Sequence, residues 1–404
     1  MRGEIETKGP AIQAPNREGR AVSDRCVTLM PAGASLAHGI GFIAEVRCIV
    51  IDKGEKMKTL SQMFSAVLLL LLGMGAHAAS GSKLVMEEFM VPAVDPGISL
   101  YVRNKHPQGV NKFPGEKILL FVHGATYPAE TTFDLKLNGL SWMDYIAQHG
   151  YDVYLVDVRG YGKSTRPPEM DKPAADNEPI VRTETAVKDV GAAVDFILKR
   201  RGVSKIDLMG WSWGTSTMGW YTTQNNDKVN RLVLYAPQWT RDAPSLTDSG
   251  GKIGAYRSVS RDAAKGRWLT GVPEDKKADL IPPGWFEAWA DATFATDPVG
   301  AKQTPPVLRA PNGVVQDGRD FWGAGKALYD PAGIRVPIFL AHAEWDADLP
   351  SYMLYAYFAK LTNAPYKRYV QIGEGTHSII MEKNRMQLFQ AVQQFLDERL
   401  KPKQ

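Results

Sequence analysis

The sequence predicts an α/β protein with a mostly parallel central sheet and helices on both faces. Three observations favour this fold class. Continuous apolar runs such as residues 117–122 are typical of strands buried on both faces of a parallel sheet. They alternate with stretches in which apolar residues recur every three or four positions, as in an amphipathic helix. One apolar run, residues 206–209, leads directly into a Gly-x-Ser-x-Gly sequence and then into a further helical stretch.

The first half of this pattern begins with a hairpin. Residues 84–92 and 98–104 flank a turn signal at Asp95-Pro96-Gly97, which predicts an antiparallel pair at a sheet edge. The elements that follow are a strand at 117–122, a helix at 142–148, a strand at 151–158, a helix at 184–201 that ends at Gly202, a strand at 206–211, a helix from Thr215 and a strand at 231–236.

After Pro237 the alternation stops. Residues 239–333 contain several prolines, short helical pieces and five of the tryptophans, but no long apolar strand. It resumes with a strand at 336–342, a helix at 351–361, a strand at 366–372 and a closing helix at 381–400. We therefore expect residues 79–238 and 334–404 to form one core, and 239–333 to form an inserted, largely helical cap. Such an insertion lies over the carboxyl ends of the strands, where sheets of this kind bind ligands.

The composition excludes several classes of function. The chain has 404 residues, 44% of them apolar, with a net charge of +4 and scattered basic residues, so neither a nucleic-acid partner nor an electrostatic membrane partner is expected. No run of Lys or Arg marks a phosphate site, and no His/Asp cluster has metal-ligand spacing, so we expect no cofactor and no metal. Both cysteines, Cys26 and Cys48, precede residue 57, which excludes a thiol nucleophile in the later part.

Residues 57–78 have the pattern of a secretory signal peptide. Lys58 provides the basic start, an apolar run with five consecutive leucines follows, and Ala76-His77-Ala78 provides a cleavage site. A membrane anchor is the alternative, but the run is shorter than the roughly 20 residues that a spanning helix needs. We expect cleavage after Ala78 and a secreted or periplasmic protein.

Residues 1–56 have mixed charge and no clear periodicity. Since signal peptides stand at the start of a chain, we hypothesise that Met57 is the true start and that residues 1–56 are upstream sequence with no ordered fold. Lys53-Gly54-Glu55 can be encoded by a purine-rich run that resembles a bacterial ribosome-binding site.

Ser212 is the candidate nucleophile. In Gly210-Trp211-Ser212-Trp213-Gly214 the serine stands at a sharp turn between a strand and a helix. The two glycines are needed because the neighbouring strand and helix leave no room for side chains there. The N–H groups at the start of the helix point to the place where negative charge would develop on a substrate carbonyl oxygen.

Residues 84–400 resemble an α/β-hydrolase with a cap domain. The resemblance depends on the Ser212 motif, on His123-Gly124 after a buried strand, on the Asp-x-Arg-Gly-x-Gly-x-Ser stretch from Asp157 to Ser164, and on a late acid and histidine. These motifs are specific for the superfamily and not for any one member. The resemblance implies the chain order serine, acid, histidine.

Two histidines follow Ser212, and they are His342 and His377. His342 falls within a predicted strand, so His377 is expected to be the base that activates the serine. The family pattern places the acid a few residues beyond the strand and four before a proline. It therefore implies Asp346, with Asp348 and Glu344 as the nearby alternatives.

The resemblance also implies an oxyanion hole made by two backbone N–H groups, from Trp213 after the nucleophile and from Ala125 after the early strand. His123 is expected to shape that loop through hydrogen bonds. Asp157 and Arg159 are expected to serve the turn and the packing and not the chemistry. The expected substrate group is apolar or aromatic, and the candidate substrate-binding residues are Tyr127, Trp211 and Trp239.

The resulting prediction is an exported serine hydrolase that cleaves a carboxylic ester or lactone through an acyl-enzyme. An amidase or aminopeptidase is an alternative, although the proline iminopeptidase branch has Gly-Gly-Pro-Gly where this chain has residues 124–127. Carbon–carbon bond hydrolysis and cofactor-free perhydrolysis use the same triad and stay open. Epoxide hydrolases and haloalkane dehalogenases are disfavoured because they place aspartate at the position of Ser212. The alternative from another class is a ligand-binding protein on a hydrolase fold.

Overall fold

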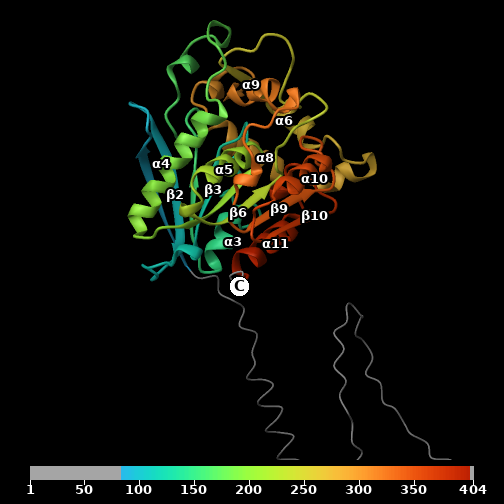
Figure 1. Cartoon of the computed structure of the whole chain (residues 1–404). Coiled ribbons are helices and arrows are strands. Elements are labelled where there is room, and N and C mark those ends of the chain that lie inside the picture. The colour runs from blue at the N-terminus through green and yellow to red at the C-terminus, as the bar shows by residue number, and fades with distance from the viewer. Residues whose placement is uncertain (1–82, 401–404) are drawn as a thin grey trace, which may run out of the picture. The chain divides into compact units, whose positions relative to one another are not determined.

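The computed structural model describes residues 83–400. The expected signal peptide at 57–78, the segment 1–56 and both cysteines lie outside the described residues. The described chain is built on an eight-stranded sheet with the strand order β1-β2-β4-β3-β5-β6-β9-β10 (Figure 1).

The sheet is mostly parallel, as predicted. β1 (Leu84–Pro92) pairs with β2 (Ser99–Pro107) in an antiparallel hairpin at one edge, and β2 is antiparallel to β4. The other five neighbouring pairs are parallel. The remaining strands of this sheet are β3 (Ile118–Val122), β4 (Asp152–Val156), β5 (Ile206–Trp211), β6 (Val229–Tyr235), β9 (Ile338–Ala343) and β10 (Lys367–Ile372).

The helices cover the two faces of the sheet. α3 and α11 pack together against it, and α4 and α5 form the second packed pair (Figure 1). The Trp142 and Phe389 rings stack at 5.0 Å between centroids and join α3 to α11. The core helices are α2 (Ala129–Thr132), α3 (Trp142–Gln148), α4 (Thr183–Arg201), α5 (Trp213–Gln224), α10 (Ser351–Lys360) and α11 (Arg385–Asp397).

Local signals explain the strand and helix bounds. Every residue of β3, β4, β5 and β9 is buried, as their continuous apolar runs require. α3 begins after Ser141, whose hydroxyl accepts a hydrogen bond from the backbone N–H of Asp144 at 2.9 Å. α4 ends at Gly202, which has a φ of 66° that glycine adopts without strain.

The insert, residues 239–333, contains four α-helices and, in addition, two short strands. Its helices are α6 (Arg261–Trp268), α7 (Lys277–Leu280), α8 (Trp285–Phe294) and α9 (Gly313–Asp320), and it also contains β7 (Tyr256–Ser260) and β8 (Val307–Pro311). These two strands pair in an antiparallel sheet of their own. β7 has no fully buried residue, so it lacks the apolar run that reveals a core strand.

Part of the core chain also belongs with the insert. The backbone N–H of Ala255 donates to the carbonyl of Ala174 at 2.9 Å, and that of Gly313 donates to the carbonyl of Ile180 at 2.7 Å. The segment between β4 and α4 therefore joins the insert above the strand ends (Figure 1).

Candidate active site

Ser212 lies at the apex of the turn between β5 and α5. Its φ is 58° and its ψ is −122°, a conformation that a residue with a side chain rarely adopts. A Cβ on Gly210 would lie 2.2 Å from the carbonyl oxygen of Gly214, and one on Gly214 would lie 2.6 Å from the carbonyl oxygen of His123. Both positions therefore require glycine, for the steric reason predicted from the sequence.

His377 lies in the loop after β10 and is paired with Asp346, from the loop after β9. Its Nδ1 is 2.9 Å from Oδ2 of Asp346, and the aspartate side chain is fully buried. The two other acid candidates have different partners. Asp348 pairs with Arg267, and Glu344 accepts the backbone N–H of Glu374. Of the three, the structure brings only Asp346 into hydrogen-bond contact with His377.

The backbone carbonyl of His377 also accepts hydrogen bonds. The Tyr235 hydroxyl donates to the carbonyl oxygen of His377 at 2.5 Å, and the Trp211 indole N–H donates to the same oxygen at 3.1 Å. Asp346 is fixed in turn, since its Oδ1 accepts the backbone N–H of Leu349 at 2.9 Å. These bonds restrict the position of the imidazole relative to the sheet.

The electrostatics at His377 favour its charged form. Burial by itself lowers the pKa of the imidazole, but the carboxylates of Asp346 and Asp348 and the hydrogen bond to Asp346 outweigh it, so its pKa is raised above 6.5. With Nδ1 bonded to a carboxylate, Nε2 is the nitrogen left to take a proton. The arrangement therefore stabilises an imidazolium that forms during a reaction.

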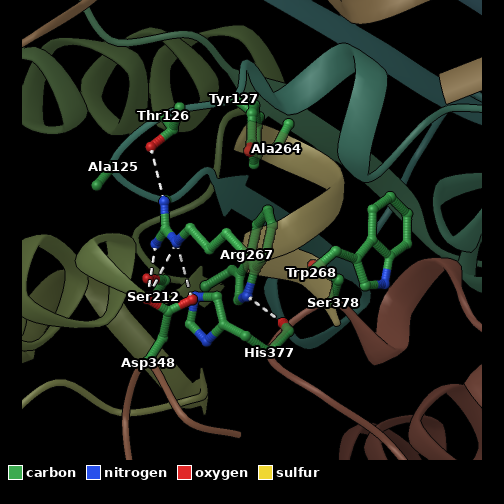
Figure 2. A pocket seen from close by; sticks show the side chains of 12 residues that line it. Ala125, Thr126, Tyr127, Ser212, Ala264, Arg267, Trp268, Asp348, His377 and Ser378 are labelled. Atoms are coloured by element: carbon green, nitrogen blue, oxygen red, sulfur yellow. Dashed lines mark hydrogen bonds and ion pairs between the residues drawn. The ribbon is translucent and has the colours of Figure 1, made fainter. Parts of the chain in front are cut away.

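Ser212 and His377 line the same cavity, which has a volume of about 20 Å³ (Figure 2). That volume holds about one water molecule. No hydrogen bond joins the serine hydroxyl to the imidazole, and such catalytic contacts commonly tighten only when substrate binds.

Two backbone N–H groups beside Ser212 are available to a ligand. That of Trp213 is the first of α5, so it has no partner within the helix. Neither it nor the N–H of Ala125 bonds to another backbone group of residues 83–400. The carbonyl of Ala125 is anchored from behind by the Tyr161 hydroxyl at 2.8 Å and by Arg257 at 2.7 Å. The loop is thus held with its N–H groups free.

His123 supports this loop and stays neutral. Its Nδ1 is 2.7 Å from the carbonyl oxygen of Gly124, and its Nε2 accepts the backbone N–H of Val158 at 3.0 Å. Burial lowers the pKa of His123 to about 4. It shapes the loop through hydrogen bonds, as the sequence indicated.

Arg267 of α6 reaches across the cavity. Its Nε lies 3.0 Å from both carboxylate oxygens of Asp348, and its Nη1 donates to the Thr126 hydroxyl at 3.3 Å (Figure 2). Burial opposes the charge on Asp348, yet the guanidinium outweighs it and lowers the pKa of that carboxyl. One side chain of the insert therefore contacts both the loop of Ala125 and the loop of Asp346. No sequence motif marks it.

Glu382 is a second residue that the sequence did not reveal. Its carboxylate is fully buried and accepts hydrogen bonds from the Trp268 indole at 2.7 Å, from the backbone N–H of Thr376 at 3.0 Å and from the Thr376 hydroxyl. Burial raises the pKa of Glu382 to about 7. The carboxylate connects α6 to the residue that precedes His377.

Two of the three expected substrate-binding residues line the cavity at Ser212, and the third does not. Tyr127 and Trp211 line the cavity at Ser212, together with Trp268 of the insert. Trp239 does not line it, because its ring packs against Tyr329 and Tyr357 at centroid distances of 6.3 and 5.3 Å.

The chain matches the model of a known family. The family of the alpha/beta hydrolase fold matches residues 117–384. The chain belongs to the α/β-hydrolase family. The match runs from β3 through β10, includes the whole insert and ends just before α11.

Solved structures of several hydrolases share this α/β-hydrolase fold. A serine hydrolase from the polyaromatic-hydrocarbon-degrading bacterium Cycloclasticus zankles is 14% identical with a TM-score of 0.50, over 78% of this chain and 98% of its own. The CarC serine hydrolase involved in carbazole degradation is 16% identical with a TM-score of 0.51, over 78% and 100%. The 2-hydroxy-6-oxo-6-phenylhexa-2,4-dienoate hydrolase of Rhodococcus sp. strain RHA1 is 14% identical with a TM-score of 0.50, over 78% and 99%.

At these identities the likeness shows the fold alone. Among curated proteins, no sequence matches this α/β-hydrolase. Within residues 83–400, no group of three or more His, Cys, Asp or Glu side chains is arranged to hold a metal ion. In the same described range, no helix combines the length and the apolar character needed to cross a membrane.

Proposed function

We propose that this protein is an exported serine hydrolase that cleaves a carboxylic ester or lactone through an acyl-enzyme intermediate. The observation that carries the proposal is the Asp346–His377 pair, with 2.9 Å between Oδ2 and Nδ1, on the cavity that Ser212 also lines. Export is supported by the signal-like pattern of residues 57–78.

Acylation begins when Oγ of Ser212 attacks the substrate carbonyl carbon and Nε2 of His377 takes the hydroxyl proton. Asp346 stabilises the imidazolium that results. The carbonyl oxygen becomes an oxyanion, which accepts hydrogen bonds from the N–H groups of Trp213 and Ala125. As the ester C–O bond breaks, His377 gives its proton to the leaving oxygen, which departs as an alcohol or, from a lactone, stays attached to the acyl chain.

Deacylation repeats the same steps with water. His377 removes a proton from water, the hydroxide oxygen bonds to the acyl carbon, and the oxyanion forms again at the same two N–H groups. The bond from Ser212 to the acyl carbon then breaks, and Oγ takes the proton back from His377. The acid product leaves and the starting state is restored.

Two cations of the insert support the oxyanion site from behind. Arg257 binds the Ala125 carbonyl and the Thr126 hydroxyl at 2.7 and 2.8 Å, and Arg267 binds the same hydroxyl. Positive charge held close to a developing oxyanion lowers the energy of the transition state, and it does so most strongly where water is excluded.

The insert forms part of the surface that a substrate would contact. α6 lines the cavity at Ser212 through Ala264, Arg267 and Trp268. A movement of α6 would change the size of this cavity, and movements of this kind set the turnover rate of many enzymes.

The test is labelling with a fluorophosphonate probe together with turnover of short p-nitrophenyl esters. We expect the probe to attach to Ser212, and we expect Ser212→Ala and His377→Ala to lose both turnover and labelling while keeping the wild-type melting temperature. Ser204→Ala is the matched control, since Ser204 is exposed and precedes β5, at the opposite end of that strand from Ser212. A folded wild-type protein that is neither labelled nor active contradicts the proposal and favours a ligand-binding protein.

Two further measurements complete the test. A panel of esters, lactones and amides identifies the bond that is cleaved, and faster turnover of amides contradicts the ester assignment. N-terminal sequencing of the secreted protein tests export. The expected first residue is Ala79, and a mature chain that retains residues before Met57 contradicts both the cleavage site and the proposed start.

A further inference from the structure

The space around Ser212 has two branches. The first, the histidine branch, is lined by His377, Ser378, Trp211 and Trp268 beside Ser212. The second, the arginine branch, also starts at Ser212 and continues along Trp213, Gln238, Arg241 and Trp322. His377 lines only the first branch.

The chemistry of the proposed reaction assigns the two branches. His377 must protonate the leaving oxygen, so the leaving group has to lie on the histidine side. The acyl chain, on the other side of the carbonyl carbon, then takes the arginine branch. This assignment depends on the proposed acyl-enzyme mechanism.

Arg241 brings into the arginine branch a positive charge that forms no contact ion pair, and the carboxylates of Asp348 and Asp346 act on it from farther away. Only 8% of the residue is exposed. Its Nε and Nη2 donate to the carbonyl oxygens of Ala243 and Pro244 at 2.5 and 3.0 Å, which leaves Nη1 without a partner among residues 83–400. No carboxylate oxygen of this part of the chain lies within the 4.0 Å that defines an ion pair. A largely buried guanidinium that has an N–H group without a partner and no contact ion pair can bind an anionic ligand through charge-assisted hydrogen bonds.

The other arginines of this region are paired with carboxylates. Arg267 and Asp348, which line both branches, form an ion pair at 3.0 Å. Arg319 pairs with Asp248 at 2.5 Å at an outer cavity. Burial lowers the pKa of Arg241, but an arginine side chain stays protonated in proteins. Arg241 is therefore the lining cation of the arginine branch that is left to bind an anion.

The arginine branch continues into a larger space. The outer cavity has a volume of about 310 Å³, and it shares Arg241, Ser245 and Gly318 with the arginine branch. Asp242 also lines this outer cavity, and its exposed carboxylate is not paired with Arg241. An acyl chain that extends from Ser212 along the arginine branch thus passes Arg241 before the chain reaches the outer cavity.

We propose that the substrate is an ester whose acyl part ends in a carboxylate, and that Arg241 binds this carboxylate. The substrate class is then the monoester of a dicarboxylic acid. The product of hydrolysis is the free dicarboxylic acid and a neutral alcohol.

The experiment compares two p-nitrophenyl esters that differ only in the far charge. One is the p-nitrophenyl monoester of adipic acid, with a free carboxylate, and the other carries a methyl ester at that end. We expect wild-type kcat/KM to favour the charged ester by about tenfold or more, which corresponds to about 1.4 kcal/mol. The same comparison with suberic acid tests the reach of the acyl chain.

Variants then identify the residue. In Arg241→Met we expect the preference for the charged ester to disappear, and in Arg241→Lys we expect part of it to remain. Arg319→Met is the matched control, because it removes one positive charge from a guanidinium that is already paired. Equal loss in both Met variants contradicts a specific role for Arg241, as does a preference that persists in Arg241→Met.

Measurements on the wild-type protein keep the proposal testable if Arg241→Met does not fold. Suberate is expected to slow fluorophosphonate labelling of Ser212, whereas dimethyl suberate at the same concentration is not. Equal protection by both contradicts the proposal. So does a preference for a carboxylate placed on the leaving phenol. Turnover of neutral esters without any charge preference overturns the role of Arg241 and leaves the serine hydrolase mechanism standing, whereas absence of labelling and turnover contradicts that mechanism itself.

Discussion

The buried carboxylate of Glu382 makes a quantitative prediction about stability and pH. The folded state raises the pKa of Glu382 from 4.5 to about 7, because the carboxylate is fully buried. The folded chain therefore holds this proton more tightly than the unfolded chain does. The contribution of Glu382 to the free energy of unfolding is greatest below the unfolded pKa and is lost as pH rises through the folded pKa.

The magnitude follows from the two pKa values. The whole change amounts to about 3 kcal/mol, and about 2.5 kcal/mol of it falls between about pH 5 and about pH 8. Glu382→Gln has nearly the same shape and no titration. We expect the stability of the wild type relative to Glu382→Gln to fall by that amount across this range.

The assay is urea unfolding of both proteins at several pH values. Asp157, whose pKa is raised to about 7, and His123, whose pKa is lowered to about 4, titrate equally in both proteins. Their effects therefore cancel in the difference between wild type and Glu382→Gln. A difference that is constant within about 0.5 kcal/mol over this range would refute the reasoning.

Three other predictions concern the site itself. The Asp348 carboxylate contributes to the raised pKa of His377, so we expect the acid limb of the kcat/KM profile above pH 6.5. In Asp348→Asn this limb should move to lower pH. A pH–rate measurement in which the limb does not move contradicts this prediction. In Gly214→Ala the new Cβ would lie 2.6 Å from the His123 carbonyl oxygen, so we expect a loss of about 1–3 kcal/mol in denaturant unfolding, and wild-type stability would show that the turn has room. Tyr235→Phe removes the hydroxyl donor that lies 2.5 Å from the carbonyl oxygen of His377. Steady-state kinetics should show a lower kcat with little change in KM. A change in KM alone would argue against a role of Tyr235 in positioning His377.

The core of the fold could be predicted because its strands are encoded locally. A continuous apolar run such as Ile118–Val122 has few stable alternatives to a buried strand, and the structure places it in the middle of the sheet. The predicted ends of helices were less accurate where a short turn decides where the helix begins. The closing helix begins at Arg385 and not at residue 381, because Ile379–Met381 forms a tight 3₁₀ turn first.

The small sheet of the insert could not be predicted in the same way. Tyr256–Ser260 pairs with Val307–Pro311 across a long stretch of intervening chain, and neither segment has a pattern that points to the other. α6 and α8 lie between the two strands along the chain, and each packs against one of them. The pairing of the strands therefore depends on tertiary packing.

The candidate site shows the same division. Ser212 has a motif, and the order of acid and histidine after it singled out the pair that lies 2.9 Å apart in the structure. Arg267 and Glu382 have no motif. Each gains its place from a contact between the insert and a core loop, and such contacts leave no trace in local spacing.

The position of Arg267 couples the insert to a loop of the core. Its side chain lines the cavity at Ser212 and also binds Thr126, next to the N–H group of Ala125. A displacement of α6 would therefore remove one support of the loop that carries Ala125. In the proposed mechanism this loop binds the oxyanion, so the position of the insert and the geometry of the oxyanion site would change together.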